Sequence, residues 1–230
     1  IAIPYKLLLK MPKGMSYEEA ACIPEAYCTS YLNLFIEGKL QKGQVLYVAA
    51  GASGLASSAI PMGKAFGAYV VTSVQTKAVA EKIENLGADE IIIQEEESIP
   101  AAFERLEKEG KAVNVCMDCL SGADLGAAMP FMARGGYWVV ISTLAGIETN
   151  VKLRPLLTKG LHLVGSMLRN RTNDKKHEIL ESLSRDMWKY FEDGSIKPSI
   201  YKVLDIKDVD EAHGILQRFE NTGKVVMRVK

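Results

Sequence analysis

The segment QVLYVAAGASGLASSA, residues 44–59, constrains the fold more than any other part of this chain. Its apolar start predicts a buried strand, and its later small residues predict a helix that follows directly. Between them, Gly51 permits a tight turn, Gly54 permits backbone to approach a ligand, and Ala56 permits close packing of helix on strand. An ordinary tight turn could have the same residues. The order strand, glycine turn, helix favours a site for a dinucleotide pyrophosphate.

The pattern after residue 44 alternates between strand-like and helix-like segments. Glycines stand at most of the joins, as expected where helices end. Strands separated by helices of about 10–13 residues indicate crossover connections and a parallel sheet. We therefore expect an α/β fold with a six-stranded, doubly wound Rossmann sheet. Strands are expected at 45–50, 69–74, 90–94, 113–120, 137–143 and 161–168, and helices at 54–66, 77–86, 99–109, 123–133 and 152–159.

Composition narrows the classes of protein that this chain can belong to. Of its 230 residues, 48% are hydrophobic, which supports a sizeable core. The 28 basic and 28 acidic residues cancel, and no basic stripe suggests binding to nucleic acid. No apolar run approaches the roughly 20 residues that span a bilayer. Four unevenly placed cysteines do not suggest a disulfide framework, so we expect a cytoplasmic protein.

Metal binding has little support in the sequence. Cys116 and Cys119 have the spacing of half a zinc site, but no second pair accompanies them. They also fall in an expected strand, where positions three apart face opposite sides of the sheet. We therefore interpret them as core residues and predict no metal site.

The flanks of the expected sheet differ from it. Ser16 and Glu19 have the spacing of a capping box, which predicts a short helix. A long amphipathic helix is expected at 174–192, and two strands at 200–204 and 224–229 enclose a helix at 209–219. These segments are too small to be separate domains, so we expect them to pair into one.

Short motifs along the whole chain resemble the medium-chain dehydrogenase/reductases. The SMLRNR motif and Pro24-Glu25-Ala26 are similar to the zinc-free quinone oxidoreductase branch, which includes zeta-crystallin. This resemblance implies a GroES-like β-barrel catalytic domain, whose first part the chain lacks. Residues 1–26 and 172–230 would be its remainder, and 27–171 the NADPH-binding Rossmann domain. The motifs are LKMPKG (9–14), EAA (19–21), IPEA (23–26), Thr29, LGAD (86–89), Asp118-Cys119, GGYWVVI (135–141), SMLRNR (166–171), EAH (211–213) and GKVV (223–226).

The resemblance also implies a set of residues that contact NADPH. Lys77 and Ser73 follow the second strand, where no carboxylate stands to bind ribose hydroxyls; Lys77 could equally be a solvated lysine. For Met167 and Leu168, core packing is the alternative. The full set comprises Gly51, Ser53, Gly54 and Leu55 at the pyrophosphate; Ser73 and Lys77 at the 2′-phosphate; Ser142 and Thr143 at the fifth strand; and Thr29, Ser166, Met167 and Leu168 at the nicotinamide.

The activity that the resemblance implies is zinc-independent reduction of a quinone by NADPH. No catalytic acid is assigned, because a reduced quinone can take its proton from water. Two alternatives stay open: an enoyl-thioester reductase, which needs an acid, and an NADPH-binding protein without activity. The expected edge strand 161–168 predicts a homodimer in which two sheets join.

Overall fold

A computed structural model describes residues 2–229, and its centre is a six-stranded parallel sheet. The strand order is β3-β2-β1-β4-β5-β6, which is the order of a doubly wound Rossmann fold and confirms the predicted class. The last strand is shorter than expected, since residues 166–168 continue beyond the sheet. The strands are β1 (Val45–Val48), β2 (Tyr69–Val74), β3 (Glu90–Ile93), β4 (Val115–Asp118), β5 (Tyr137–Val140) and β6 (His162–Gly165).

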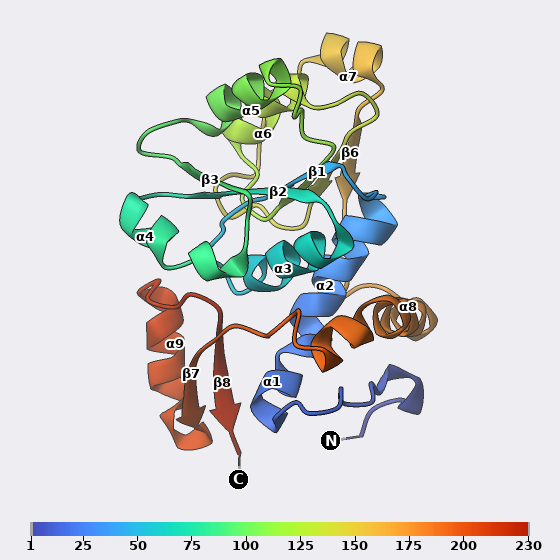
Figure 1. Ribbon diagram of the computed structural model, residues 1–230, viewed down its shortest axis with the longest axis vertical. Coiled ribbons are helices and arrows are strands. Elements are labelled where there is room, and N and C mark those ends of the chain that lie inside the picture. Colours follow the sequence, from blue (N-terminus) through green and yellow to red (C-terminus); the bar gives the residue numbers. More distant parts are fainter. Residues whose placement is uncertain (1, 230) are drawn as a thin grey trace.

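Helices cover both faces of the sheet (Figure 1), with α3 on one face and α5 and α6 on the other. Two helices are shorter than expected. The segment predicted at 77–86 splits into α4 and a 3-10 turn, and that at 123–133 changes at Pro130, which has no N–H to continue an α-helix. The elements are α3 (Ala56–Phe66), α4 (Lys77–Glu81), η4 (Glu84–Leu86), α5 (Ile99–Lys108), α6 (Ala123–Ala128), η5 (Met129–Phe131) and α7 (Leu153–Lys159).

The two faces of the sheet pack into separate cores. Leu46 and Val48 of β1 contribute to the core beneath α3, and Val45 and Tyr47 to the core beneath α5 and α6. All four residues are buried, as a strand covered on both faces requires. The alternation of β1 therefore explains why its sequence is apolar at every position.

The two flanking parts of the chain lie together below the sheet in Figure 1. The predicted capping box is confirmed, because Ser16 Oγ accepts from the Glu19 amide and Glu19 accepts from the Ser16 amide. Strands β7 and β8 form a separate two-stranded parallel sheet. The elements are η1 (Tyr5–Leu7), α1 (Tyr17–Ala21), η2 (Ile23–Tyr27), α2 (Cys28–Tyr31), η3 (Leu32–Glu37), α8 (Asn173–Glu192), β7 (Ile200–Asp205), η6 (Ile206–Asp208), α9 (Val209–Gln217) and β8 (Lys224–Arg228).

The division into a catalytic remainder and a Rossmann domain stays a prediction, and its residues 1 and 230 lie outside the described part. Across residues 2–229, none of the helices combines the length and the apolar character that crossing a membrane requires.

Candidate functional site

The glycine turn between β1 and α3 is tightly built. The Gly51 amide donates to the Ser73 carbonyl at 2.8 Å, and Ser53 Oγ accepts from the Ala56 amide at 3.1 Å. A Cβ on Gly51 would lie 2.6 Å from Thr72 Oγ1, so only glycine fits at this position. The left-handed backbone belongs to Ala50, with a φ of 55°. The turn thus has the close packing that its sequence predicted.

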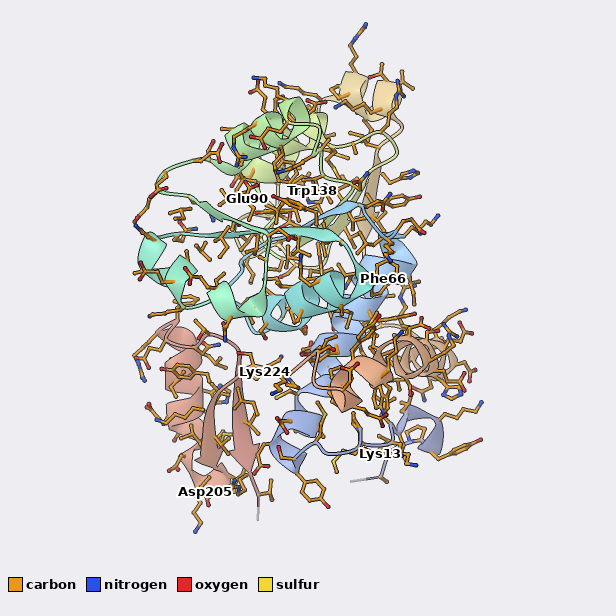
Figure 2. All side chains as sticks on the ribbon, viewed as in Figure 1. Lys13, Phe66, Glu90, Trp138, Asp205 and Lys224 are labelled. Atoms are coloured by element: carbon orange, nitrogen blue, oxygen red, sulfur yellow. The ribbon has the colours of Figure 1, made fainter. Side chains whose placement is uncertain are left out.

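Two amides of this turn are available to a ligand. Within residues 2–229, the N–H groups of Gly54 and Leu55 donate to no protein acceptor. The start of β8 lies beside them: a Cβ on Gly54 would be 3.3 Å from Lys224 Cδ and 3.4 Å from the Gly223 carbonyl oxygen. Figure 2 shows Lys224 where β8 approaches the rest of the chain. Free amides, a helix N-terminus and a lysine stem together fit an anionic pyrophosphate.

The Lys224 ammonium is partly neutralised. Its Nζ lies 3.1 Å from Glu25 Oε2, across a sequence separation of 199 residues. The motif that includes Gly223 and Lys224 contributes to the family resemblance, but its place beside the glycine turn was not predicted. Nothing in the local sequence pattern could have indicated this contact, because it joins distant segments.

A cavity of about 590 Å³ brings four of the predicted residues together. Thr29, Ser166, Met167 and Leu168 all line it, beside Glu25 and Ile141. Ser166 is buried, and its Oγ has no hydrogen-bond partner. Met167 is 57% exposed, which argues against the alternative that it packs in the core, whereas Leu168 does pack against the core below α3. An orphaned hydroxyl in a mainly apolar cavity fits a ligand with a polar group.

The same cavity contains residues that the sequence reasoning missed. Asn33 lies one helical turn after Thr29, and this spacing of four could have indicated a shared face. Cys28 also lines the cavity, and burial raises its thiol pKa to about 12, with the nearby Glu25 carboxylate adding to the effect. The thiol is therefore neutral near pH 7 and a poor nucleophile. The remaining lining residues are Leu7, Pro24, Arg169, Lys176, Ile179 and Leu180.

The two residues predicted at the 2′-phosphate lie differently from each other. Ser73 is fully buried, and its Oγ lies 2.7 Å from the Tyr47 hydroxyl inside the sheet. Its side chain therefore faces the core, which corrects the prediction that it contacts a phosphate. Lys77 is exposed in the first turn of α4, whose N-cap Thr76 accepts a hydrogen bond from the Val79 amide. Side chains alternate between the two faces of a strand, and Ser73 is still within β2, so its side chain points into one of the two cores. Lys77 lies beyond the strand and is free of this constraint.

Ser142 and Thr143 follow β5 at the carboxyl edge of the sheet, as predicted. The Ser142 carbonyl accepts from Ser121 Oγ at 2.9 Å. Nearby, buried Asp118 ends β4 and accepts from the amides of Leu120 and Ser121 at 2.8 and 3.0 Å, and from Trp138 Nε1 at 2.8 Å. These bonds hold the loops after β4 and β5 in place.

Cys116 is fully buried in β4, which confirms the interpretation that it is a core residue. Burial raises its thiol pKa well above the usual range, and raises that of Cys119 to about 11. Residues 2–229 contain no group of three or more histidine, cysteine, aspartate or glutamate side chains that could hold a metal ion.

Two curated relatives match nearly the whole chain. The Quinone oxidoreductase-like protein 2 homolog of Nematostella vectensis is 28% identical over 231 residues, covering 99% of this chain. The Highly reducing polyketide synthase AN6791 of Emericella nidulans is 29% identical over 96% of this chain. The chain spans only 62% of the first relative's length and 9% of the second's.

Two solved structures share the fold. An NAD-dependent alcohol dehydrogenase is 25% identical, with a TM-score of 0.79, over 99% of this chain and 63% of its own. The crotonyl-CoA carboxylase/reductase AntE in complex with NADP is 22% identical, with a TM-score of 0.79, over 95% of this chain and 58% of its own. The model of the zinc-binding dehydrogenase family matches residues 54–185, more than half of the chain. This chain therefore belongs to the zinc-binding dehydrogenase family, within the medium-chain dehydrogenase/reductase superfamily.

Proposed function

We propose that this protein transfers reducing equivalents from NADPH to a quinone or a similar conjugated carbonyl, without zinc. The observation that carries the proposal is the cavity lined by Thr29 and Ser166, with its unpaired hydroxyl, at the carboxyl edge of the sheet. In doubly wound folds, this edge is where ligands bind. The similarity to the quinone oxidoreductase-like protein of Nematostella vectensis supports the same activity.

The chain's own residues would divide the work of binding between two places. The Gly54 and Leu55 amides, with Lys224 beside them, would hold the pyrophosphate through charge and hydrogen bonds. Thr29 and the segment 166–168 would hold the nicotinamide in the cavity. The exposed Lys77 would meet the 2′-phosphate, which favours NADPH over NADH. In this arrangement, Ser73 supports the turn through its backbone carbonyl and does not touch the cofactor.

The proposed reaction does not require a catalytic acid or base from the protein. When bound, the nicotinamide would supply a hydride, which is two electrons and one hydrogen nucleus, to the quinone. One proton from water would then complete the hydroquinone. The apolar walls of the cavity exclude water from the transfer, and its polar groups orient the two rings against each other. The neutral Cys28 thiol has no role as a nucleophile in this reaction.

The direct test is consumption of NADPH by the natural protein when a simple quinone is added. We expect the NADPH absorbance to fall and NADH to react more slowly, and Lys77→Glu should reduce that preference. The matched control is Lys207→Glu, since Lys207 is an exposed lysine in η6. If calorimetry detects no binding of NADPH or NADH, the proposal is wrong.

An enoyl-thioester reductase is the second candidate. It is favoured by the matches to a polyketide synthase and a crotonyl-CoA carboxylase/reductase. Arg169 and Lys176 also line the cavity, where they could attract a phosphate of a thioester carrier. This reaction must protonate a substrate carbon, which requires an acid. Rapid reduction of a crotonyl thioester together with no reaction with quinones would favour this candidate.

We also propose that two copies pair through β6. This strand is at the edge of the six-stranded sheet, and its Leu163 side chain is 45% exposed. Pairing with its twin would satisfy the free edge. Light scattering should give the mass of a dimer. Leu163→Pro should yield a monomer, because the N–H groups of His162 and Ser166 donate to β5 and that of Leu163 therefore faces the free edge, where proline removes it. A natural protein that is monomeric at all concentrations would contradict this.

A further inference from the structure

Asn33 has an unusual position in the cavity that Thr29 and Ser166 share. Only 1% of its surface is exposed, and its Oδ1 has no hydrogen-bond partner. Its Nδ2 donates to the Thr29 carbonyl at 2.7 Å. This bond fixes the orientation of the amide, because a flipped side chain would bring two oxygens together. Asn33 therefore keeps an acceptor, and not a donor, without a partner.

An acceptor in this state is costly to the protein alone. A buried polar atom without a partner loses its bonds to water and gains none in the protein, whereas a leucine of similar volume would lose no such bonds. Asn33 is also the second residue of a stretch of irregular backbone, the π-helical segment η3, which directly follows α2. Such segments occur frequently at functional sites. Both observations are explained if a ligand in the cavity supplies the missing donor.

The second unpaired group of the cavity narrows the chemistry of this ligand. Ser166 Oγ is also buried without a partner, and a hydroxyl can donate. One acceptor and one donor on the wall of one cavity complement a primary carboxamide, which has N–H donors and a carbonyl acceptor. A quinone has only acceptors and cannot satisfy Asn33. The nicotinamide of NADPH carries a primary carboxamide on its ring.

We infer that Asn33 is a cofactor-binding residue whose Oδ1 accepts a hydrogen bond from the nicotinamide carboxamide, while the Ser166 hydroxyl donates to the carboxamide oxygen. This inference rests on the proposed function. It deepens that function by assigning the orientation of the ring to a side chain outside the glycine turn and the segment 166–168. The bond between Asn33 Nδ2 and the Thr29 carbonyl then places the acceptor before the cofactor arrives.

The test removes the proposed hydrogen bond first by changing the ligand and then by changing Asn33. Calorimetry would compare NADP⁺ with its acetylpyridine analogue, in which a methyl group replaces the carboxamide nitrogen. For the natural protein, we expect about 5–10-fold tighter binding of NADP⁺, which corresponds to one hydrogen bond. In Asn33→Leu, the two ligands should bind equally. The control Asn150→Leu, at an exposed asparagine, should keep the preference.

A third ligand separates failure of this inference from failure of the proposed function. Adenosine bisphosphate, the far half of NADPH, should bind the natural protein and Asn33→Leu equally. If it binds but the natural protein does not distinguish NADP⁺ from the analogue, the inference is overturned and cofactor binding stands. That comparison needs no variant, so it holds even if Asn33→Leu does not fold. If neither NADP⁺ nor adenosine bisphosphate binds, the inference and the proposed function are both wrong. Selective loss of hydroquinone affinity in Asn33→Leu would also overturn the inference.

Discussion

The six-stranded sheet and the β7–β8 pair are both parallel, yet they are stabilised in different ways. Every residue of β1 is buried, whereas most of β7 is exposed. An isolated two-stranded sheet is marginal in water, so β7 and β8 depend on neighbouring segments. Ion pairs from Arg228 to Glu18 and from Lys224 to Glu25 connect β8 to the first helices. The central sheet is thus held by its own cores, and the small one by contacts between distant parts of the chain.

The largest effect is expected from removing core volume in the central sheet. Leu46→Ala deletes a fully buried side chain of β1 and should lower the free energy of unfolding by about 2–5 kcal/mol. Val203→Ala in β7, where the side chain is 38% exposed, should cost less than about 1 kcal/mol. Urea unfolding of both variants measures the difference. Equal losses would contradict the contrast between the two sheets.

A comparison of two aspartates tests whether polar groups also contribute more to stability in the central sheet than in the β7–β8 pair. Asp118→Leu leaves two buried donors and one partly buried donor without an acceptor and should destabilise the protein by about 3 kcal/mol. Asp205, which accepts from the Lys207 amide at the end of β7, is exposed. Asp205→Leu should therefore cost about 1 kcal/mol or less. Figure 2 labels Asp205, and also Trp138, whose indole donates to Asp118. Thermal unfolding would show whether Asp118→Leu destabilises the protein more than Asp205→Leu does.

The contact between the two regions at Lys224 should matter more for binding than for folding. Lys224→Met keeps the stem beside Gly54 and removes the charge, so we expect about 3–10-fold weaker binding of NADPH at low salt. The control is Lys202→Met at an exposed lysine of β7, which should change nothing. As the salt concentration rises, the NADPH affinities of the two variants, measured by calorimetry, should become more similar. Identical affinities at low salt would exclude a role for this charge.

A further expected effect is on stability at alkaline pH. Burial and a hydrogen bond to Asp186 raise the pKa of Tyr31 to about 12, compared with about 10 in an unfolded chain. Between these values the unfolded state loses the proton first, so stability is complete below about pH 10 and falls as the pH rises towards 12. Tyr31→Phe should flatten this decline. Unfolding by urea across this pH range would show it, and an unchanged slope would contradict the assignment.

The sequence predicted the central sheet well, since its signals are local. Alternating apolar runs, glycines at helix ends and the turn around Gly51 each act within a few residues, and all six strands were found. The splitting of the helix at 123–133 was missed, although Pro130 could have indicated it. The errors at the site arose from geometry that periodicity alone does not give. Ser73 was placed at the ligand, yet its position in β2 directs it into the core.

The parts of the site that joined distant segments could not have been predicted. The cavity combines residues from before β1 and after β6, and of its lining only the spacing of four between Thr29 and Asn33 could have been recognised in the sequence. Likewise, Lys224 reaches Gly54 across most of the chain. The resemblance to a family supplied Thr29 and 166–168, but not the side chains that this particular chain adds around them.

The contact of Gly223 and Lys224 with the glycine turn has a consequence for folding during synthesis on the ribosome. The turn and β1 leave the ribosome before the other strands of the sheet, which can close once β6 is available. The wall formed by β8, however, cannot be present until residue 224 has left the exit tunnel. A nascent chain arrested between β6 and β8 would hold an assembled sheet with one side of its glycine turn bare to solvent.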